Sequence, residues 1–127
     1  MITSNSTEIL NRADFEQFFE EVCVGEAEIL EELASDIKRE GQELVDSILS
    51  SFKSEDLVVL QRSAHTLKSS TRIFGGVLIS QQAADIEKLA NPDSPADFGT
   101  VSGALADIQE NFSNFLIQLE TVIDSKK

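Results

Sequence analysis

The sequence predicts an all-α protein: an antiparallel up-down four-helix bundle with a short extra N-terminal helix. Apolar residues recur at spacings of three and four along most of the chain. No clear apolar-polar alternation is present, and no Asn-Gly or Asp-Gly pair predicts a hairpin. The chain has 6 Gly and 2 Pro, and both Pro fall within residues 91–95. These observations favour helices joined by short connections.

The first two predicted helices cover residues 14–22 and 26–52. The short helix ends at Gly25, and its aromatic residues are Phe15, Phe18 and Phe19. One face of the long helix carries Leu30, Leu33, Ile37, Leu44, Ile48 and Phe52. Gly41 interrupts this face, which predicts close packing against a neighbour or a slight bend. We expect residues 1–11, which are polar and lack a cap, to be loosely ordered.

The next two predicted helices cover residues 55–74 and 77–90, with the pair Gly75-Gly76 at the corner between them. Ser54 is the expected N-cap of the earlier helix, with two acids at its positive end. The expected buried stripe of that helix is Leu57, Leu60, Ala64, Leu67, Thr71 and Phe74. The expected buried residues of the later helix are Ile79, Ala83, Ile86, and Leu89 or Ala90.

The last predicted helix is a single long one with the most regular stripe. We expect Ser94 to cap it, Pro95 to occupy its first position and Asp97 to be an acid of the first turn. Its stripe runs over about six turns. The members of the stripe are Val101, Leu105, Ile108, Phe112, Phe115, Leu119 and Val122.

Composition excludes several classes of protein. The length of 127 residues and an apolar content of 41% predict one globular domain over residues 1–127. A net charge of −13 argues against nucleic-acid and membrane-surface partners. The single Cys, Cys23, excludes an internal disulfide, and with one His it makes a zinc site improbable. Without a predicted signal peptide or membrane span, we expect a cytoplasmic protein.

The acids are unevenly distributed. None lies between Asp56 and Asp85, although the chain has 23 and roughly five would be expected there by proportion. The same interval carries Arg62, Lys68, Arg72 and the only His, His65. We therefore predict that one face of this acidic protein is free of carboxylates and suited to receive negative charge.

Helical geometry places His65 on an accessible face. At about 100° per residue, one side of the helix predicted over residues 55–74, beside its apolar stripe, carries Gln61, His65, Lys68, Ser69 and Arg72. An accessible neutral imidazole is a nucleophile near pH 7. A cation one turn away can offset the charge of a transferred phosphoryl group. This pattern predicts covalent acceptance of a phosphoryl group on His65.

Other chemistries fit less well. The nearby Ser residues lie on the same helix as His65, and no oxyanion-hole loop is visible, so a hydrolytic triad is not expected. No GxxxxGK[ST] loop or kinase-type Gly-rich loop is present. We therefore expect neither intrinsic kinase nor ATPase activity, and whether the protein counts as an enzyme stays open.

At these residues the chain resembles the histidine phosphotransfer (HPt) domains of two-component phosphorelays. The family pattern is a His, a Lys three positions on, a small pair after it and a Gly ten positions past the His. This pattern is met here by His65, Lys68, Ser70 and Gly75. The family fold is a four-helix bundle with a short extra N-terminal helix. The sequence departs from the family at Ser69, where Gly is usual.

The resemblance implies a role for each of these residues. His65 would accept a phosphoryl group from the phospho-aspartate of a receiver domain and pass it to another receiver, and Lys68 would steady the charge. The predicted docking residues are Gln61, Ser69, Ser70, Arg72, Gly75 and Gly76, with an apolar contribution from Phe15, Phe18 or Phe19. Glu87, 22 positions past His65, is a candidate contact of the imidazole.

The resemblance implies no cofactor on this chain, because the Mg²⁺ of such reactions belongs to the receiver. The expected partners are receiver domains of response regulators, and a hybrid sensor histidine kinase is a further candidate. We expect a monomer. Two alternatives stay open: a non-transferring helical adaptor that docks receivers or kinases, which Ser69 motivates, and a substrate domain of an ATP-binding kinase.

Overall fold

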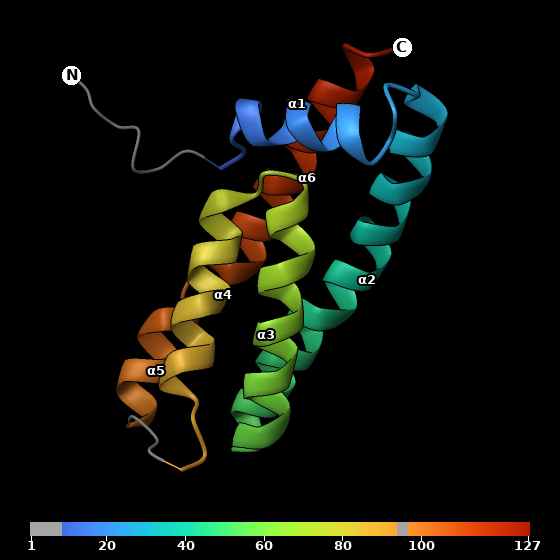
Figure 1. Cartoon of the computed structure of the whole chain (residues 1–127). Helices are drawn as coiled ribbons and strands as arrows, with labels where there is room; N and C mark the ends of the chain where they lie inside the picture. Colours follow the sequence, from blue (N-terminus) through green and yellow to red (C-terminus); the bar gives the residue numbers. More distant parts are fainter. Residues whose placement is uncertain (1–8, 94–96) are drawn as a thin grey trace, which may run out of the picture.

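The computed structural model describes residues 9–93 and 97–127, and this part of the chain contains helices and no strands (Figure 1). The all-α prediction is confirmed. The helices are α1 (Arg12–Glu21), α2 (Ala27–Lys53), α3 (Leu57–Ile73), α4 (Val77–Leu89), α5 (Phe98–Leu105) and α6 (Ile108–Asp124).

The helices form a bundle in which α3 packs against both α2 and α4. Helix α6 packs against α2 and α4, and α5 packs against α4. Helix α1 lies across one end of the bundle, above the turn that joins α3 to α4 (Figure 1). The chain reverses direction at that turn, so residues near the end of α4 lie beside residues in the first half of α3 (Figure 1).

The apolar stripes predicted from the sequence supply much of the core. In α2, however, Val45 is fully buried, whereas the predicted Leu33, Leu44 and Phe52 are only half-buried. Leu30, Leu60, Leu67, Ile79 and Ile86 are fully buried, and so are Phe112 and Phe115 of α6. Helices α2 and α6 pack closely at Gly41, because a Cβ at this position would collide with the ring of Phe112. The prediction of close packing at Gly41 is therefore confirmed.

The prediction of a single long last helix is wrong. Helix α5 ends at Leu105 and α6 begins at Ile108, with Asp107 between them in a left-handed conformation (φ 66°). Gln82 of α4 bridges the break, because its amide donates to the carbonyl oxygens of Ala104 and Ala106 at 3.1 and 2.8 Å. The apolar spacing continues across the break, so periodicity alone does not reveal it.

Two predicted helix starts also need correction. Asp97 is the N-cap of α5 and accepts from the backbone N–H of Thr100 at 2.9 Å, while Ser94 and Pro95 lie outside the described residues. Asp56, not Ser54, caps α3 and accepts from Val59 at 3.2 Å. Aspartate is as strong an N-cap as serine, so these choices are decided by the path of the turn.

Helix α1 begins earlier than predicted. Asn11 caps it, accepting from the backbone N–H of Asp14 at 2.9 Å. Leu10 is buried, and the backbone N–H of Asn11 donates to the carbonyl of Gly75 at 2.7 Å. These two residues are held against the bundle, contrary to the expectation of loose order, which for residues 1–8 falls outside the described part of the chain.

Candidate functional site

His65 stands on the outer face of α3. Its neighbours Ala64 and Leu67 are fully buried, whereas the His65 side chain is 60% exposed. The buried stripe fixes the rotation of α3, and this rotation turns the imidazole toward solvent. The predicted accessibility of His65 is therefore confirmed.

Glu87 of α4 contacts both His65 and Lys68. Its Oε2 lies 2.6 Å from His65 Nδ1, and its Oε1 accepts from Lys68 Nζ at 2.7 Å. The Glu87 side chain is only 24% exposed, so the carboxylate is partly shielded from water. The hydrogen bond from Lys68, and then that from His65, hold the pKa of Glu87 below its ordinary value, although partial burial acts in the opposite direction. The predicted contact of Glu87 with the imidazole is confirmed.

The same contact corrects the prediction of a face free of carboxylates. The interval 57–84 has no acid, but α4 runs back along α3 and places Glu87 directly beside His65. Lys68 is consequently half of an ion pair rather than an unpaired cation. The absence of acids from one stretch of sequence does not show which side chains a neighbouring helix places beside it.

The bond to Glu87 determines which ring nitrogen of His65 is free. An ionised carboxylate only accepts hydrogen bonds, so Nδ1 carries the proton that bridges to Glu87. In the neutral imidazole the lone pair then resides on Nε2. Carboxylate partners commonly fix the tautomer and orientation of functional imidazoles in this way. The arrangement makes Nε2 an oriented nucleophile.

Two further hydrogen bonds join α3 to α4 around this site. Gln61 Nε2 donates to the backbone carbonyl of Glu87 at 3.2 Å. The hydroxyl of Ser80 donates to the backbone carbonyl of Lys68 at 3.0 Å. Gln61, a predicted docking residue, also has a structural role, because its amide holds the end of α4 against α3.

Two predicted docking residues lie on the face of α3 that carries His65, whereas Ser70 is turned toward α2 and lines a cavity with Leu33 and Ile37. Ser69 and Arg72 are exposed, and Ser70 is half-buried. The Ser69 hydroxyl donates to the backbone carbonyl of His65 at 3.4 Å, so it folds back onto its own helix. Replacing the usual Gly by Ser therefore adds little bulk to this surface.

The two glycines predicted for docking are buried, which corrects that prediction. Gly75 has a φ of +83°, and a Cβ there would lie 2.7 Å from the carbonyl oxygen of Asn11. A Cβ at Gly76 would lie 2.7 Å from a ring carbon of Phe115. Both glycines are required for the packing of the α3–α4 turn, beneath α1 and against α6, and are not available to a partner.

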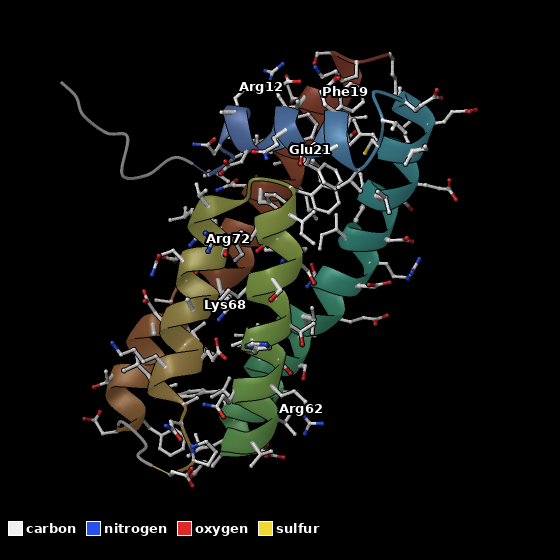
Figure 2. The ribbon with its side chains drawn as sticks, in the orientation of Figure 1. Arg12, Phe19, Glu21, Arg62, Lys68 and Arg72 are labelled. Carbon is white, nitrogen blue, oxygen red and sulfur yellow. The ribbon has the colours of Figure 1, made fainter. Side chains whose placement is uncertain are left out.

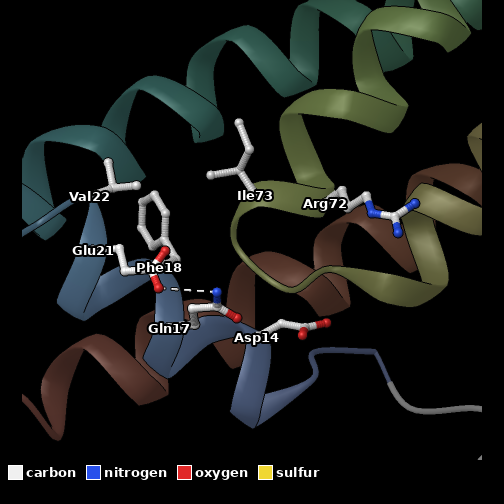
Figure 3. Close-up of a pocket in the computed structure, with 7 residues that line it drawn as sticks. All are labelled: Asp14, Gln17, Phe18, Glu21, Val22, Arg72 and Ile73. Atoms are coloured by element: carbon white, nitrogen blue, oxygen red, sulfur yellow. Dashed lines mark hydrogen bonds between the residues drawn. The ribbon is translucent and has the colours of Figure 1, made fainter.

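The aromatic residues of α1 are also buried, so the expected contribution of Phe15, Phe18 or Phe19 to an exposed surface is wrong. The exposed apolar side chains here are Val22 and Ile73, at 55% and 54%. They line an open cavity of about 290 Å³ between α1 and the end of α3 (Figure 3). In the sequence, Val22 directly follows α1 and Ile73 is the last residue of α3, and neither belongs to the buried stripe of the neighbouring helix.

The described residues contain no group of three His, Cys, Asp or Glu side chains that could hold a metal ion. Cys23 is fully buried, and burial raises the pKa of its thiol. No helix in the described part of the chain combines the length and apolar character needed to cross a membrane.

Comparison with known proteins places the chain in a family. No curated protein matched it, and no solved structure matched it. A sequence model of the Hpt domain family matches residues 27–122, a range that includes His65, Lys68 and Glu87 and leaves out α1. Hpt domains take part in phosphotransfer in two-component signalling and generally interact with receiver domains in phosphorelays. Because the match covers well over half of its length, the chain belongs to the Hpt domain family.

Proposed function

We propose that this protein is a phosphorelay carrier that accepts a phosphoryl group on His65 from the phospho-aspartate of one receiver domain and passes it to another. The observation that carries the proposal is the exposed imidazole whose Nδ1 is held by Glu87 at 2.6 Å. We also propose that the chain has the family's up-down four-helix arrangement. Its four members are α2, α3, α4 and the broken α5–α6 pair, and α1 is the extra helix.

The transfer follows from the geometry of the ring. The Nε2 lone pair attacks the phosphorus, and the P–N bond forms as the bond from phosphorus to the aspartyl oxygen breaks. The aspartyl carboxylate leaves with the electron pair, while the Nδ1 proton stays on the ring. The ring becomes cationic, and the carboxylate of Glu87 lies where it offsets this charge. Passing the group on to a second receiver aspartate is the reverse of this step.

Lys68 serves the reaction in two ways. Its hydrogen bond of 2.7 Å holds Glu87 in place against the imidazole. Its side chain is 31% exposed, so the ammonium group also lies within reach of negative charge that arrives from solvent. No group of the proposed step needs a nucleotide or a metal on this chain, because the Mg²⁺ of the reaction belongs to the receiver.

The proposed partners are receiver domains, with a hybrid sensor histidine kinase as one source of the first receiver. They would dock on the face around His65, where Ser69 and Arg72 are accessible. Val22 and Ile73 add apolar area beside this face, next to the half-buried Ser70. We retain the expectation that the protein acts as a cytoplasmic monomer.

A labelled receiver tests the proposal. Mixed with a ³²P-phosphorylated receiver, the protein is expected to take up a label that is acid-labile and alkali-stable, as phosphohistidine is. His65→Gln should abolish uptake and leave the fold unchanged, because the side chain is exposed. Circular dichroism of the variant checks the fold. Undiminished uptake by the variant would contradict the proposal, and a receiver that binds but keeps its phosphoryl group would favour the adaptor alternative.

A further inference from the structure

We propose that Arg72 anchors an acidic side chain of the docked receiver and thereby helps to select which receivers exchange phosphate with this protein. The inference rests on the proposed function, because it concerns the partner that reaches His65. It assigns to Arg72 a role in specificity that is separate from the chemistry at the imidazole.

Arg72 lies on the same face as the phosphoryl acceptor. It is seven residues past His65, which is two turns and roughly 10 Å along the axis of α3. Positions seven residues apart on a helix point in nearly the same direction. One edge of α3 therefore carries His65, Lys68 and Arg72. Figure 2 shows Lys68 and Arg72 on the side of α3 that borders α4, with Arg62 near the start of the helix. A protein seated over His65 also covers Arg72.

Of the two cations Lys68 and Arg72, Arg72 is the one whose charge is not already paired. Lys68 is bound by Glu87, whereas the guanidinium of Arg72 takes part in no hydrogen bond or ion pair with the side chains and backbone of residues 9–93 and 97–127. Its side chain is exposed, and in Figure 3 it extends away from Asp14 and Gln17. A guanidinium presents a planar fork that matches a carboxylate at two points. Arg72 can therefore receive a carboxylate without first breaking an existing pair.

The surface beside Arg72 is hollowed on both sides. One cavity, of about 290 Å³, has Phe18, Val22 and Ile73 in its lining (Figure 3). The other, of about 210 Å³, lies between α3 and α4 and has Lys68 and Ser80 in its lining. Arg72 belongs to both linings, so a partner that fills either recess brings its own residues next to the guanidinium.

Charge also favours an acidic partner at this place. The protein has a net charge of −13, so an acidic surface is repelled by most of it. The interval 57–84 of α3 and α4 has no acid, and Asp14 of α1 is the carboxylate that both cavities share. Glu21 also lines the first cavity, and the carboxylate of Glu87 is already paired with Lys68. An acidic side chain therefore approaches Arg72 against few carboxylates compared with the rest of this acidic surface.

Transfer kinetics test the inference. A phosphorylated receiver domain is the natural donor, and phosphoramidate is a small donor that reaches His65 without docking. Arg72→Glu should lower the second-order rate of transfer from the receiver at least about tenfold at low salt, with a smaller effect at high salt because exposed charges are screened. Arg72→Lys should keep part of the rate. Labelling by phosphoramidate should change less than about twofold, because docking is not involved.

Lys53→Glu is the matched control. It makes the same change of net charge at an exposed residue at the end of α2. It should leave transfer from the receiver within about twofold of the unmodified protein. A rate that falls as much in Lys53→Glu as in Arg72→Glu would show that only the overall charge matters, and would overturn the inference.

Compensating changes identify the carboxylate. In the receiver, each exposed Asp or Glu around the phosphorylation site is replaced by Lys in turn, and one replacement should restore transfer to Arg72→Glu. Absence of any rescue, an unchanged rate in Arg72→Glu, or an equal loss with phosphoramidate would each overturn the inference. Failure of the unmodified protein to be labelled by either donor would instead overturn the proposed function.

Discussion

The Nδ1 atom of His65 lies 2.6 Å from Oε2 of Glu87, although the two residues are 22 positions apart in the sequence. The contact joins the one imidazole of the chain to a carboxylate whose other oxygen is bonded to Lys68. The three side chains form a connected group on two helices. Their charges and orientations are therefore coupled, and changes to any one of them should act on the others.

Removing the Glu87 carboxylate should slow phosphotransfer without preventing it. Glu87→Ala leaves Nδ1 without its acceptor, so the ring can place its proton on either nitrogen and the share with a free Nε2 falls. We expect a loss of about tenfold in the rate, or about 1.4 kcal/mol in the activation barrier. Nitrogen NMR of the His65 ring should show the change of tautomer directly.

Glu87→Gln separates the charge of Glu87 from its hydrogen bond. The amide oxygen can still accept from Nδ1, but it no longer offsets the cationic ring, so the rate should fall between those of the parent and the alanine variant. If both variants transfer as fast as the parent while the tautomer shifts, the bond to Glu87 is structural only.

Replacing Lys68 tests the charge beside the acceptor. Lys68→Ala should slow transfer by one to two orders of magnitude, roughly 1.4–2.7 kcal/mol, because it removes the ammonium and also releases Glu87. The free energy of unfolding should change little, since partly exposed ion pairs contribute about 0–1 kcal/mol. Quenched-flow transfer and urea unfolding measure the two effects.

Lys88→Ala is the control for Lys68, because Lys88 is exposed, adjacent to Glu87 in sequence and without an ion pair among the described residues. If Lys68 acts partly through Glu87, the effects of Lys68→Ala and Glu87→Gln should be less than additive. Strict additivity would mean that the two side chains act independently.

Gly75 should be intolerant of any side chain. Gly75→Ala places a Cβ at a φ of +83° and 2.7 Å from the Asn11 carbonyl, so either the turn or α1 must move. We expect destabilisation of about 1–3 kcal/mol, measured by urea unfolding.

Gly103→Ala is the matched control for Gly75. Gly103 lies within α5, and a Cβ there meets nothing within 4 Å. This change should leave stability equal or raise it by about 0.4–1 kcal/mol. Equal effects of the two substitutions would contradict the packing role of Gly75.

The ion pair that ties α1 to the residues just after α6 should give a pH-dependent stability. Lys126 Nζ lies 2.6 Å from Glu16 Oε1 and 4.9 Å from the ring centre of Phe19. The hydrogen bond from Lys126, with that from Arg12, lowers the pKa of Glu16 from its ordinary value of 4.5. The folded state therefore binds this proton less readily than the unfolded state does. The contribution to stability is full above about pH 4.5 and is lost as the pH falls through the lower folded value.

Urea unfolding between pH 3 and 7 measures this contribution. The difference between the parent and Glu16→Gln should be largest near neutral pH and should shrink as the solution becomes more acidic. Glu20→Gln, an exposed position on the same helix, serves as the control. A difference that grows on acidification would contradict the assignment to the Glu16–Lys126 pair.

Much of the fold could be predicted because apolar spacing directly records which side of a helix is buried. The stripes of α2, α3, α4 and α6 contain many of the core residues, from Leu30 to Val122, although Val45 and Cys23 are also fully buried. The break at Asp107 escaped prediction because the spacing on either side of it stays in phase. The capping residues were uncertain for a similar reason: several residues near each helix start have side chains able to cap, and only the backbone path chooses among them.

The sequence by itself determined that the chain is helical, that His65 faces solvent and that Lys68 stands one turn away. These properties follow from the period of a single helix, which the order of residues specifies. Only the tertiary structure decided that Glu87 reaches the imidazole and that Gly75 and Gly76 are covered by α1 and α6. It also decided that the Arg72 side chain has no ion-pair partner within the described part of the chain. Such contacts depend on how neighbouring helices are aligned, and that alignment comes from packing the whole core at once.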